Sequence, residues 1–163
     1  MRKTLIFALL LALLPCGMAQ AEDGGQKIFR AGSRPSAEVR AENFSGKAWS
    51  DPVFQAPAPA RAYGALVTFE SGSRTNWHTH PLGQTLLVTS GKGITQEWGK
   101  EPAIILPGDV VVCPPNVKHW HGAVNDTGMT HLAISERGEK PVEWAEKVND
   151  AEYAKAIKMA EGR

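Results

Sequence analysis

Apolar and polar residues alternate over short stretches in the middle of the chain, and Gly or Pro separates each stretch from the next. Alternation with period two is typical of strands that pack on one face, and evenly spaced turn residues predict a sandwich or barrel. The predicted strands are residues 62–70, 75–80, 84–89, 94–98, 103–106, 109–113, 118–123 and 130–135. Because no helical period interrupts them, we predict an all-β barrel domain over residues 44–140.

The segment before this domain has a different composition. Residues 22–43 are rich in Gly, Gln and charge, which predicts a flexible N-terminal leader, with an edge strand at residues 27–30. Three prolines between residues 44 and 61 confine that part of the chain to edge strand and loop.

The segment after the domain has helical spacing. Residues 141–148 and 151–160 carry apolar side chains at mixed helical intervals, and Asp150 is available as an N-cap. We therefore predict one or two short helices in a C-terminal helical segment over residues 141–163, packed on the outside of the barrel or on a second subunit.

Residues 1–21 have the three parts of a secretory signal peptide. A short positive start is followed by an apolar run of about ten residues and by the small-residue cleavage signal Ala19-Gln20-Ala21. We expect cleavage after Ala21, a periplasmic or secreted protein, and no membrane association afterwards, because the apolar run is too short to span a bilayer. A lipoprotein modified at Cys16 is the alternative, but Pro15 directly before the cysteine argues against it.

Four of the five histidines lie in two short pairs, and the fifth, His131, follows ten residues later. His78 and His80 point to the same face of a strand, and so do His119 and His121, because side chains alternate faces with period two. Two such pairs can converge on one interior point. Imidazole groups suit several divalent transition metals, so we predict a metal site; the alternative is a set of buried histidines bonded to one another.

The net charge indicates which partners to expect, and the cysteine content indicates whether disulfides stabilise the fold. Loss of Arg2 and Lys3 with the signal peptide changes the formal net charge from +1 to −1, which gives no indication of nucleic acid binding. Loss of Cys16 leaves Cys113 alone, so no intramolecular disulfide is expected and the core and the metal must hold the fold. Cys113 follows three valines and precedes two prolines, which favours a buried, inert thiol.

The first histidine pair lies in a spaced motif. Gly72 is followed after five residues by His78 and His80, then after three residues by Gln84, and after six more by Gly91. This stretch resembles the first motif of the cupin family, with Gln where that motif usually has Glu.

The second pair lies in a matching motif. Gly108 is followed after five residues by Pro114, and His119 lies five positions beyond that proline. This stretch resembles the second cupin motif, with Asn116 where Gly is usual and without an Asn four residues after His119.

The stretches HTHPLGQTL, PPNVKHWHG and MTHLAIS narrow the resemblance further. They are similar to the small single-domain bacterial cupins that include manganese-dependent hydroxynitrile lyases and proteins related to carboxymuconolactone decarboxylase. The resemblance covers about residues 44–153. It implies a double-stranded β-helix or jelly-roll barrel that forms homodimers or homotetramers and binds a divalent metal, manganese before Fe, Zn, Co or Ni. The implied metal ligands are His78, His80, Gln84 and His119.

The same resemblance implies a lyase that cleaves a small-molecule cyanohydrin reversibly into an aldehyde and cyanide. In that scheme the metal binds the substrate hydroxyl and His121 is the general base that takes its proton. From its position alone, His121 could instead be a fifth ligand or a support for the ligands. His131 is a second candidate catalytic residue, either in contact with substrate or as a buried partner of the site.

Gln84 bears on the choice of reaction. A neutral amide leaves more positive charge on the ion than a carboxylate would, which favours Lewis-acid chemistry and works against redox cycling with oxygen. Two alternatives stay open: a cupin-type metal-dependent dioxygenase or isomerase, and a non-catalytic periplasmic protein that binds a small ligand or a metal.

Overall fold

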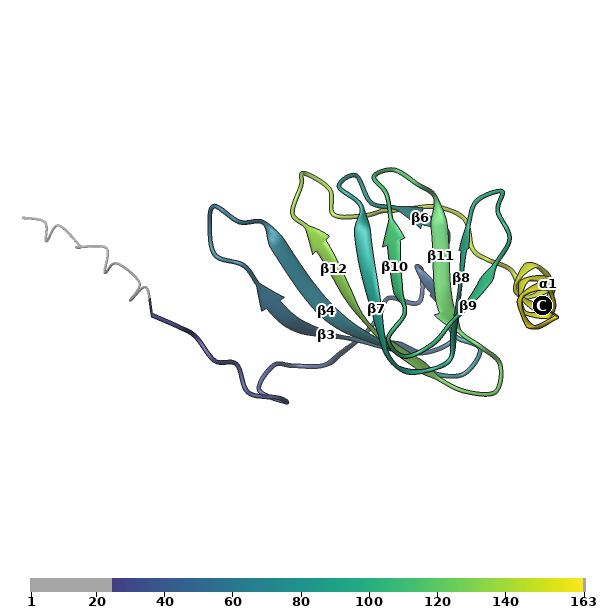
Figure 1. Cartoon of the computed structure of the whole chain (residues 1–163), viewed down its shortest axis with the longest axis horizontal. Coiled ribbons are helices and arrows are strands. Elements are labelled where there is room, and N and C mark those ends of the chain that lie inside the picture. Colours follow the sequence, from purple (N-terminus) through teal and green to yellow (C-terminus); the bar gives the residue numbers. More distant parts are fainter. Residues whose placement is uncertain (1–24, 163) are drawn as a thin grey trace, which may run out of the picture.

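The structure is a computed structural model that describes residues 25–162 (Figure 1), so the expected signal peptide lies outside the described residues. The strands of the described chain pair antiparallel in two sheets. The first sheet, sheet A, has the order β1 (Ala37–Glu38), β3 (Ala48–Gln55), β4 (Ala62–Phe69), β12 (Met129–Glu136), β7 (Gln84–Gly91) and β10 (Val110–Cys113). The second, sheet B, has the order β13 (Glu143–Trp144), β6 (His78–Thr79), β11 (His119–Ala123), β5 (Arg74–Thr75) and β2 (Phe44–Ser45), and β8 (Gly93–Glu97) pairs with β11 and with β9 (Ala103–Ile105).

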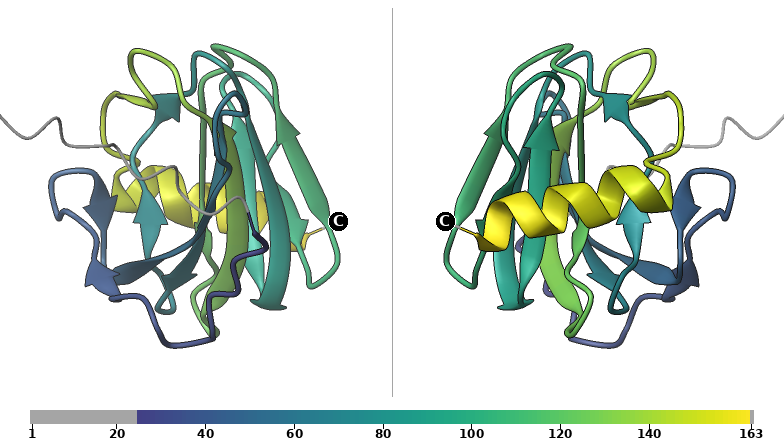
Figure 2. Two further views of the ribbon diagram at one scale, coloured as in Figure 1. Left: turned by 90° about the vertical axis from the view of Figure 1, so that its left-hand side faces the viewer. Right: turned by 90° about the vertical axis from the view of Figure 1, so that its right-hand side faces the viewer.

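The two sheets curl around a common interior, and the helix α1 (Asp150–Glu161) lies outside it. Figure 1 shows β3, β4, β12, β7 and β10 on one side of the interior and β6, β11, β8 and β9 on the other. In the right-hand view of Figure 2, α1 crosses the outer face of the strands. The predicted all-β barrel is therefore confirmed, with a single C-terminal helix in the described chain.

Side-chain alternation along β11 divides the apolar residues between two cores. Ala123 points into the barrel and packs with Phe69 and Met129 from sheet A. Trp120 points out of the barrel and packs with Tyr153 of α1. Because Trp120 separates His119 from His121, the alternation that buries the tryptophan under the helix turns both histidines into the barrel.

The predicted strand over residues 75–80 is interrupted. β5 ends at Thr75 and β6 begins at His78, because the backbone between them changes partners. The amide of Asn76 donates to the carbonyl of Asn43, whereas the amide of Trp77 donates to the carbonyl of Glu146. His78 and His80 still lie on one strand path, so the interruption preserves their common direction.

The C-terminal segment is only partly helical. Glu143–Trp144 forms the strand β13 opposite His78 and Thr79 instead of the helix considered for residues 141–148. The single helix begins at Asp150, and its N-cap is Asn149, whose Oδ1 accepts a hydrogen bond from the amide of Glu152. The helix was predicted correctly, but its cap is one residue earlier than expected.

The sheet begins before residue 44. Ala37–Glu38 pairs with Trp49 and Ser50 at the edge of sheet A, whereas the expected strand at residues 27–30 is absent from the described chain. Phe29 is exposed there. Between residues 25 and 162, no helix has both the length and the apolar character that a membrane span needs.

Candidate metal centre

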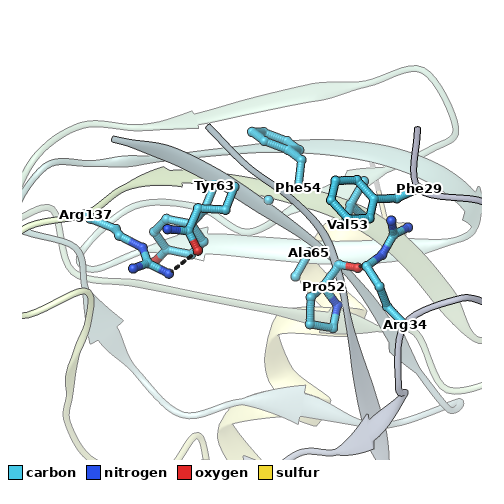
Figure 3. A pocket seen from close by; sticks show the side chains of 10 residues that line it. Phe29, Arg34, Pro52, Val53, Phe54, Tyr63, Ala65 and Arg137 are labelled. Carbon is cyan, nitrogen blue, oxygen red and sulfur yellow. Dashed lines mark hydrogen bonds between the residues drawn. The ribbon is translucent and has the colours of Figure 1, made fainter. Parts of the chain in front are cut away.

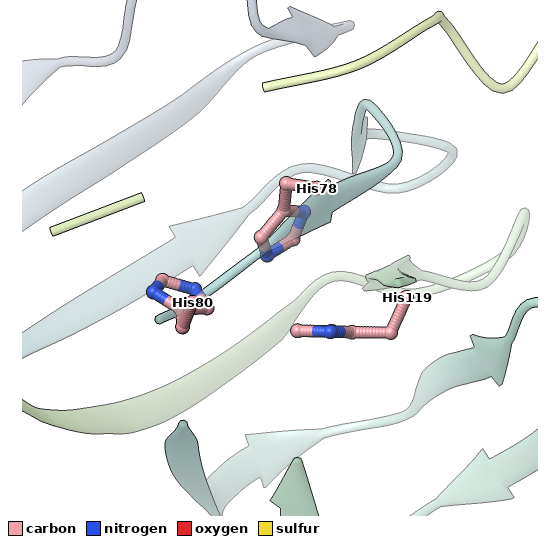
Figure 4. A group of neighbouring side chains, drawn as sticks. All are labelled: His78, His80 and His119. Carbon is pink, nitrogen blue, oxygen red and sulfur yellow. The ribbon is translucent and has the colours of Figure 1, made fainter. Parts of the chain in front are cut away.

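Three histidines meet inside the barrel. His78 and His80 come from the β6 segment and His119 from the start of β11, where it is the Cα partner of His78. The three side chains are 1%, 6% and 2% exposed. One ring nitrogen from each lies within 4.8 Å of the others, and Figure 4 shows the three rings converging.

Each of these rings is held through its Nδ1 atom. Nδ1 of His78 lies 2.9 Å from the carbonyl oxygen of Asn76, and Nδ1 of His119 lies 2.9 Å from that of Val117. Nδ1 of His80 lies 2.8 Å from the carbonyl oxygen of Pro141. Because a carbonyl only accepts, each neutral ring must carry its proton on Nδ1, which leaves the Nε2 lone pair free for a metal.

The donor atoms that remain fit a metal ion. Nε2 of His80, Nε2 of His119 and Oε1 of Gln84 are buried without a hydrogen-bond partner. Buried polar atoms are rarely left unpaired, because an unmade hydrogen bond costs about 1–3 kcal/mol. Gln84 begins β7, and its side chain is close enough to the His80 ring to offset a small part of the lowering of that ring's pKa by burial. The structure therefore places all four predicted ligands in one region, with uncharged N and O donors.

Burial keeps the three histidines neutral. It lowers the pKa of His78 well below the usual value, and the neighbouring His119 lowers it further. Burial also lowers the pKa of His119 and of His80, although their backbone hydrogen bonds work in the opposite direction. Neutral imidazole is the form that binds metals, so the site is ready for an ion at neutral pH without first losing protons.

His121 and His131 form a separate pair beside this cluster. Nδ1 of His121 lies 3.2 Å from Nε2 of His131, and neither residue belongs to the group of nitrogens within 4.8 Å. Burial lowers the pKa of His121 well below its ordinary value and lowers that of His131 to about 4. Phe69 packs against both rings, with centroids 5.8 and 5.7 Å away. The structure thus places His131 in the interior, next to the proposed base.

Two residues of the site were not found from the sequence. Pro141 supplies the carbonyl that holds His80, and the ring of Trp144 lies 4.9 Å from the ring of His78 between centroids. The available signal was a proline followed closely by an isolated aromatic residue in a charged stretch, which is too weak to predict a contact with a strand more than sixty residues earlier.

An apolar pocket of about 440 Å³ lies on the β3 and β4 side of the barrel (Figure 3). Pro52, Phe54, Tyr63 and Ala65 contribute to its wall, and no histidine does. Ser135 is the Cα partner of both Tyr63 and Gln84, so one strand separates this pocket from the amide beside the histidine cluster.

Known proteins match both the fold and the sequence. The cupin domain family matches residues 65–135. An (R)-mandelonitrile lyase from Granulicella tundricola is 55% identical over 128 residues, which are 78% of this chain and 98% of that protein. With this fold, site and relative, the chain belongs to the cupin family, among its small single-domain members.

Solved structures agree with this assignment. A cupin-like protein from Thermotoga maritima has a TM-score of 0.70 and 40% identity, covering 85% of this chain and all of that one. The polyketide cyclase RemF from Streptomyces resistomycificus has a TM-score of 0.67 at 12% identity, covering 83% of this chain and 99% of its own, and it supports the fold alone.

Proposed function

We propose that this cupin is a metal-dependent lyase of the hydroxynitrile lyase type, which cleaves a cyanohydrin reversibly to an aldehyde and cyanide. The observation that carries the proposal is the set of buried, partnerless donor atoms on His80, His119 and Gln84, in a chain 55% identical to an (R)-mandelonitrile lyase. His78, with the same Nδ1 anchoring, completes the proposed ligand set.

We assign His78, His80, Gln84 and His119 as the ligands of a divalent ion, with manganese as the first candidate. When bound, the ion would supply Lewis-acid stabilisation for an oxygen that gains negative charge. The chain's part is to hold three imidazoles in the Nδ1–H form and to present an amide instead of a carboxylate. The absence of a negative side chain among these four donors supports a non-redox role.

His121 is the proposed general base. Burial lowers its pKa, so its ring is neutral at physiological pH and has a lone pair for the proton of the substrate hydroxyl, although the same burial makes it a weaker base than an exposed histidine. The electrons of the O–H bond then form the carbonyl, and the C–C bond electrons leave with cyanide, which takes the proton back from His121. To accept at Nε2, His121 must carry its own proton on Nδ1 and donate it to Nε2 of His131. His131 would therefore hold the base in the productive tautomer.

The apolar pocket beside sheet A suits the part of the substrate that does not react. Phe54, Tyr63, Pro52 and Ala65 offer a surface for an aromatic or aliphatic substituent, one strand away from Gln84. This arrangement supports hydrophobic cyanohydrins, of which mandelonitrile is the natural first test.

Metal content and activity of two variants separate the proposed roles. The unaltered protein, produced with manganese in the medium, should contain the metal and release benzaldehyde from mandelonitrile. His119→Ala should lose metal and activity together, because it removes a ligand. His121→Ala should keep the metal and lose at least about 100-fold in kcat, the usual scale for removal of a general base. Elemental analysis and the rate of benzaldehyde formation are the two measurements.

Other outcomes would indicate a different role for His121 or a different class of protein. If His121→Ala sheds its metal, His121 is a ligand and the proposed base is wrong. Oxygen uptake with a diketone or catechol-like substrate, without cyanohydrin cleavage, would indicate a dioxygenase. Tight retention of a small ligand without turnover would indicate a binding protein.

We also propose that the mature protein begins at Glu22, resides in the periplasm or outside the cell, and forms homodimers or homotetramers. The charged start, apolar run and Ala19-Gln20-Ala21 signal support export, and the oligomer is what the resemblance of the two histidine motifs to small bacterial cupins implies. The intact mass of protein from the periplasmic fraction and its mass in solution test the two statements.

A further inference from the structure

His80 differs from the other two clustered histidines in where its anchor comes from. His78 and His119 each bond through Nδ1 to a carbonyl two residues earlier on their own segment. The Nδ1 atom of His80 bonds to the carbonyl of Pro141, which is 61 residues further along the chain. The orientation of His80 therefore depends on a distant segment, residues 141–149, which we call the C-terminal strap.

The strap covers the histidine cluster with both backbone and side chain. Its strand β13 places Trp144 opposite His78, and the two ring centroids are 4.9 Å apart. The pairing continues beyond β13. The amide of Ala145 donates to the carbonyl of Trp77, and the amide of Trp77 donates to the carbonyl of Glu146. Two of the three clustered histidines thus touch the strap directly.

The far end of the strap is fixed by Arg74. This arginine is 6% exposed, and its Nε donates to the carbonyl of Val148 at 3.0 Å. A second guanidinium nitrogen lies 2.6 Å from Oδ1 of Asp150, the first residue of α1. The guanidinium also stacks on the ring of Tyr153 at 4.5 Å, and the Tyr153 hydroxyl donates to the carbonyl of Ala123. The Arg74 side chain therefore contacts the strap at Val148, the start of the helix at Asp150, and the ring of Tyr153 within the helix.

We propose that the C-terminal strap couples the docking of helix α1 to metal affinity, with the Pro141 carbonyl as the positioning group for His80 and Arg74 as the residue that holds the strap in place. This inference rests on the proposed metal site. It assigns the helix a functional role besides covering the outer face of sheet B.

The coupling follows from shared contacts. When the start of α1 loosens, Val148 and Asp150 lose their common anchor, and the strap can move away from His80 and Trp77. A His80 ring without its carbonyl partner samples other orientations and tautomers, so fewer molecules present Nε2 to the ion. By reciprocity, an ion bound at the cluster must favour the docked strap and helix by the same factor.

Equilibrium binding of Mn²⁺ tests this coupling without any assay of catalysis. Free Mn²⁺ is measured by its solution EPR signal for the unaltered protein and for Arg74→Lys, Asp150→Ala and Glu161→Gln. Arg74→Lys keeps the charge but cannot reach Val148 and Asp150 together, and Asp150→Ala removes one partner. Arg74→Lys should weaken binding by at least about fivefold, the lower end of ordinary coupling between sites. Asp150→Ala should weaken it by a smaller factor, because the Asp150 side chain is exposed and Arg74 keeps its bond to Val148.

Glu161→Gln is the matched control. It removes the 2.9 Å ion pair with Lys92 at the other end of the same helix, away from the strap, and should change the affinity by less than about twofold. All measurements are made where the metal-free proteins are fully folded, so a loss of stability alone does not lower the affinity. Equal affinities in all four proteins, or equal weakening in all three variants, would overturn the coupling alone. No binding to the unaltered protein would overturn the metal site together with it.

Discussion

The buried histidines of this protein differ in the group that their Nδ1 atom contacts. The three clustered rings bond to backbone carbonyls, which fixes their proton on Nδ1, whereas His121 meets the imidazole of His131. An imidazole can donate or accept, so this pair has two possible proton arrangements. The remaining nitrogen of His131, Nδ1, is buried without a hydrogen-bond partner. His131 is therefore a ring that the fold keeps neutral, with little to stabilise a positive charge on it.

We predict that His131 makes the metal-free protein sensitive to mild acid. Its pKa is lowered to about 4 in the folded chain, from about 6.5 when unfolded. In that window the unfolded state binds more protons, so the free energy of unfolding falls as the pH drops below about 6.5 and levels off near 4. A shift of this size corresponds to about 3 kcal/mol. Urea unfolding in the presence of a chelator at pH 7 and pH 4.5 measures the loss.

His131→Phe is the matching variant, because an aromatic ring of similar size next to Phe69 cannot titrate. Its stability should fall less between the two pH values than that of the unaltered protein. The other buried histidines shift in the same direction and remain in both proteins, so only the difference belongs to His131. Identical losses in the two proteins would contradict the prediction.

The residues of the site could be predicted from the sequence where a local period decides their direction. Spacing by two placed His78 with His80, and the turn spacing placed Gln84 in the next strand. The face of His131 was uncertain from the sequence, because residues 129–135 carry apolar side chains on both faces of the strand, and alternation alone does not say which face is interior. Pro141 could not be predicted, because its contact is made by a backbone carbonyl.

At the scale of elements, the corner between β7 and β8 carries the chain from sheet A to sheet B. Gly91 ends β7 with φ of 79° and is the Cα partner of Met129. A Cβ atom added to Gly91 would lie 1.9 Å from the carbonyl oxygen of Gly128, which is backbone and cannot rotate away. The corner therefore needs glycine for its conformation and for its close approach to the neighbouring turn.

Gly91→Ala should destabilise the protein far more than the same change at Gly99. Gly99 has φ of 76° but no atom within 4 Å of an added Cβ, so its substitution costs only the left-handed conformation, about 1–2 kcal/mol. Gly91→Ala adds steric displacement of two strands, roughly 1–3 kcal/mol more. Thermal and urea unfolding of the two variants give the comparison. Equal destabilisation would mean that the corner relaxes without cost.

The strands and the helix that could be predicted are those whose own sequence has a recognisable pattern of apolar, polar and turn residues. Apart from the interrupted strand over residues 75–80, the strands from residue 62 to residue 135 end at turn residues and were predicted to within a few positions. β13 has only two residues, and its partner β6 lies more than sixty residues earlier, so nothing local distinguishes it from a helix start. The break between β5 and β6 has the same origin, since it reflects which distant backbone pairs with Asn76 and Trp77.

At the scale of the whole molecule, the proposed metal site joins the two sheets. Gln84 belongs to β7 of sheet A, whereas His78 and His119 belong to β6 and β11 of sheet B. The strap brings a third segment to the same point through Pro141. No disulfide joins the sheets in the described chain, where Cys113 is free and buried, so a bound ion would add a direct link between them to their shared apolar core.

Metal removal should therefore lower the melting temperature of the whole domain. An ion held at about 100 times its dissociation constant stabilises the folded state by about 2.7 kcal/mol. For a domain of this size, that corresponds to a shift of roughly 10 °C. Calorimetry of the Mn²⁺-loaded protein before and after treatment with a chelator measures the shift, and the transition should remain single because the ion connects both sheets.

His119→Ala provides the control for this experiment, because it keeps the fold but lacks one proposed ligand. Its melting temperature should respond weakly or not at all to Mn²⁺ and chelator. A chelator effect of equal size in both proteins would place the ion elsewhere on the molecule. A stabilisation confined to one of two separate transitions would mean that the ion holds one sheet only, and the link between Gln84 of sheet A and the histidines of sheet B would then be wrong.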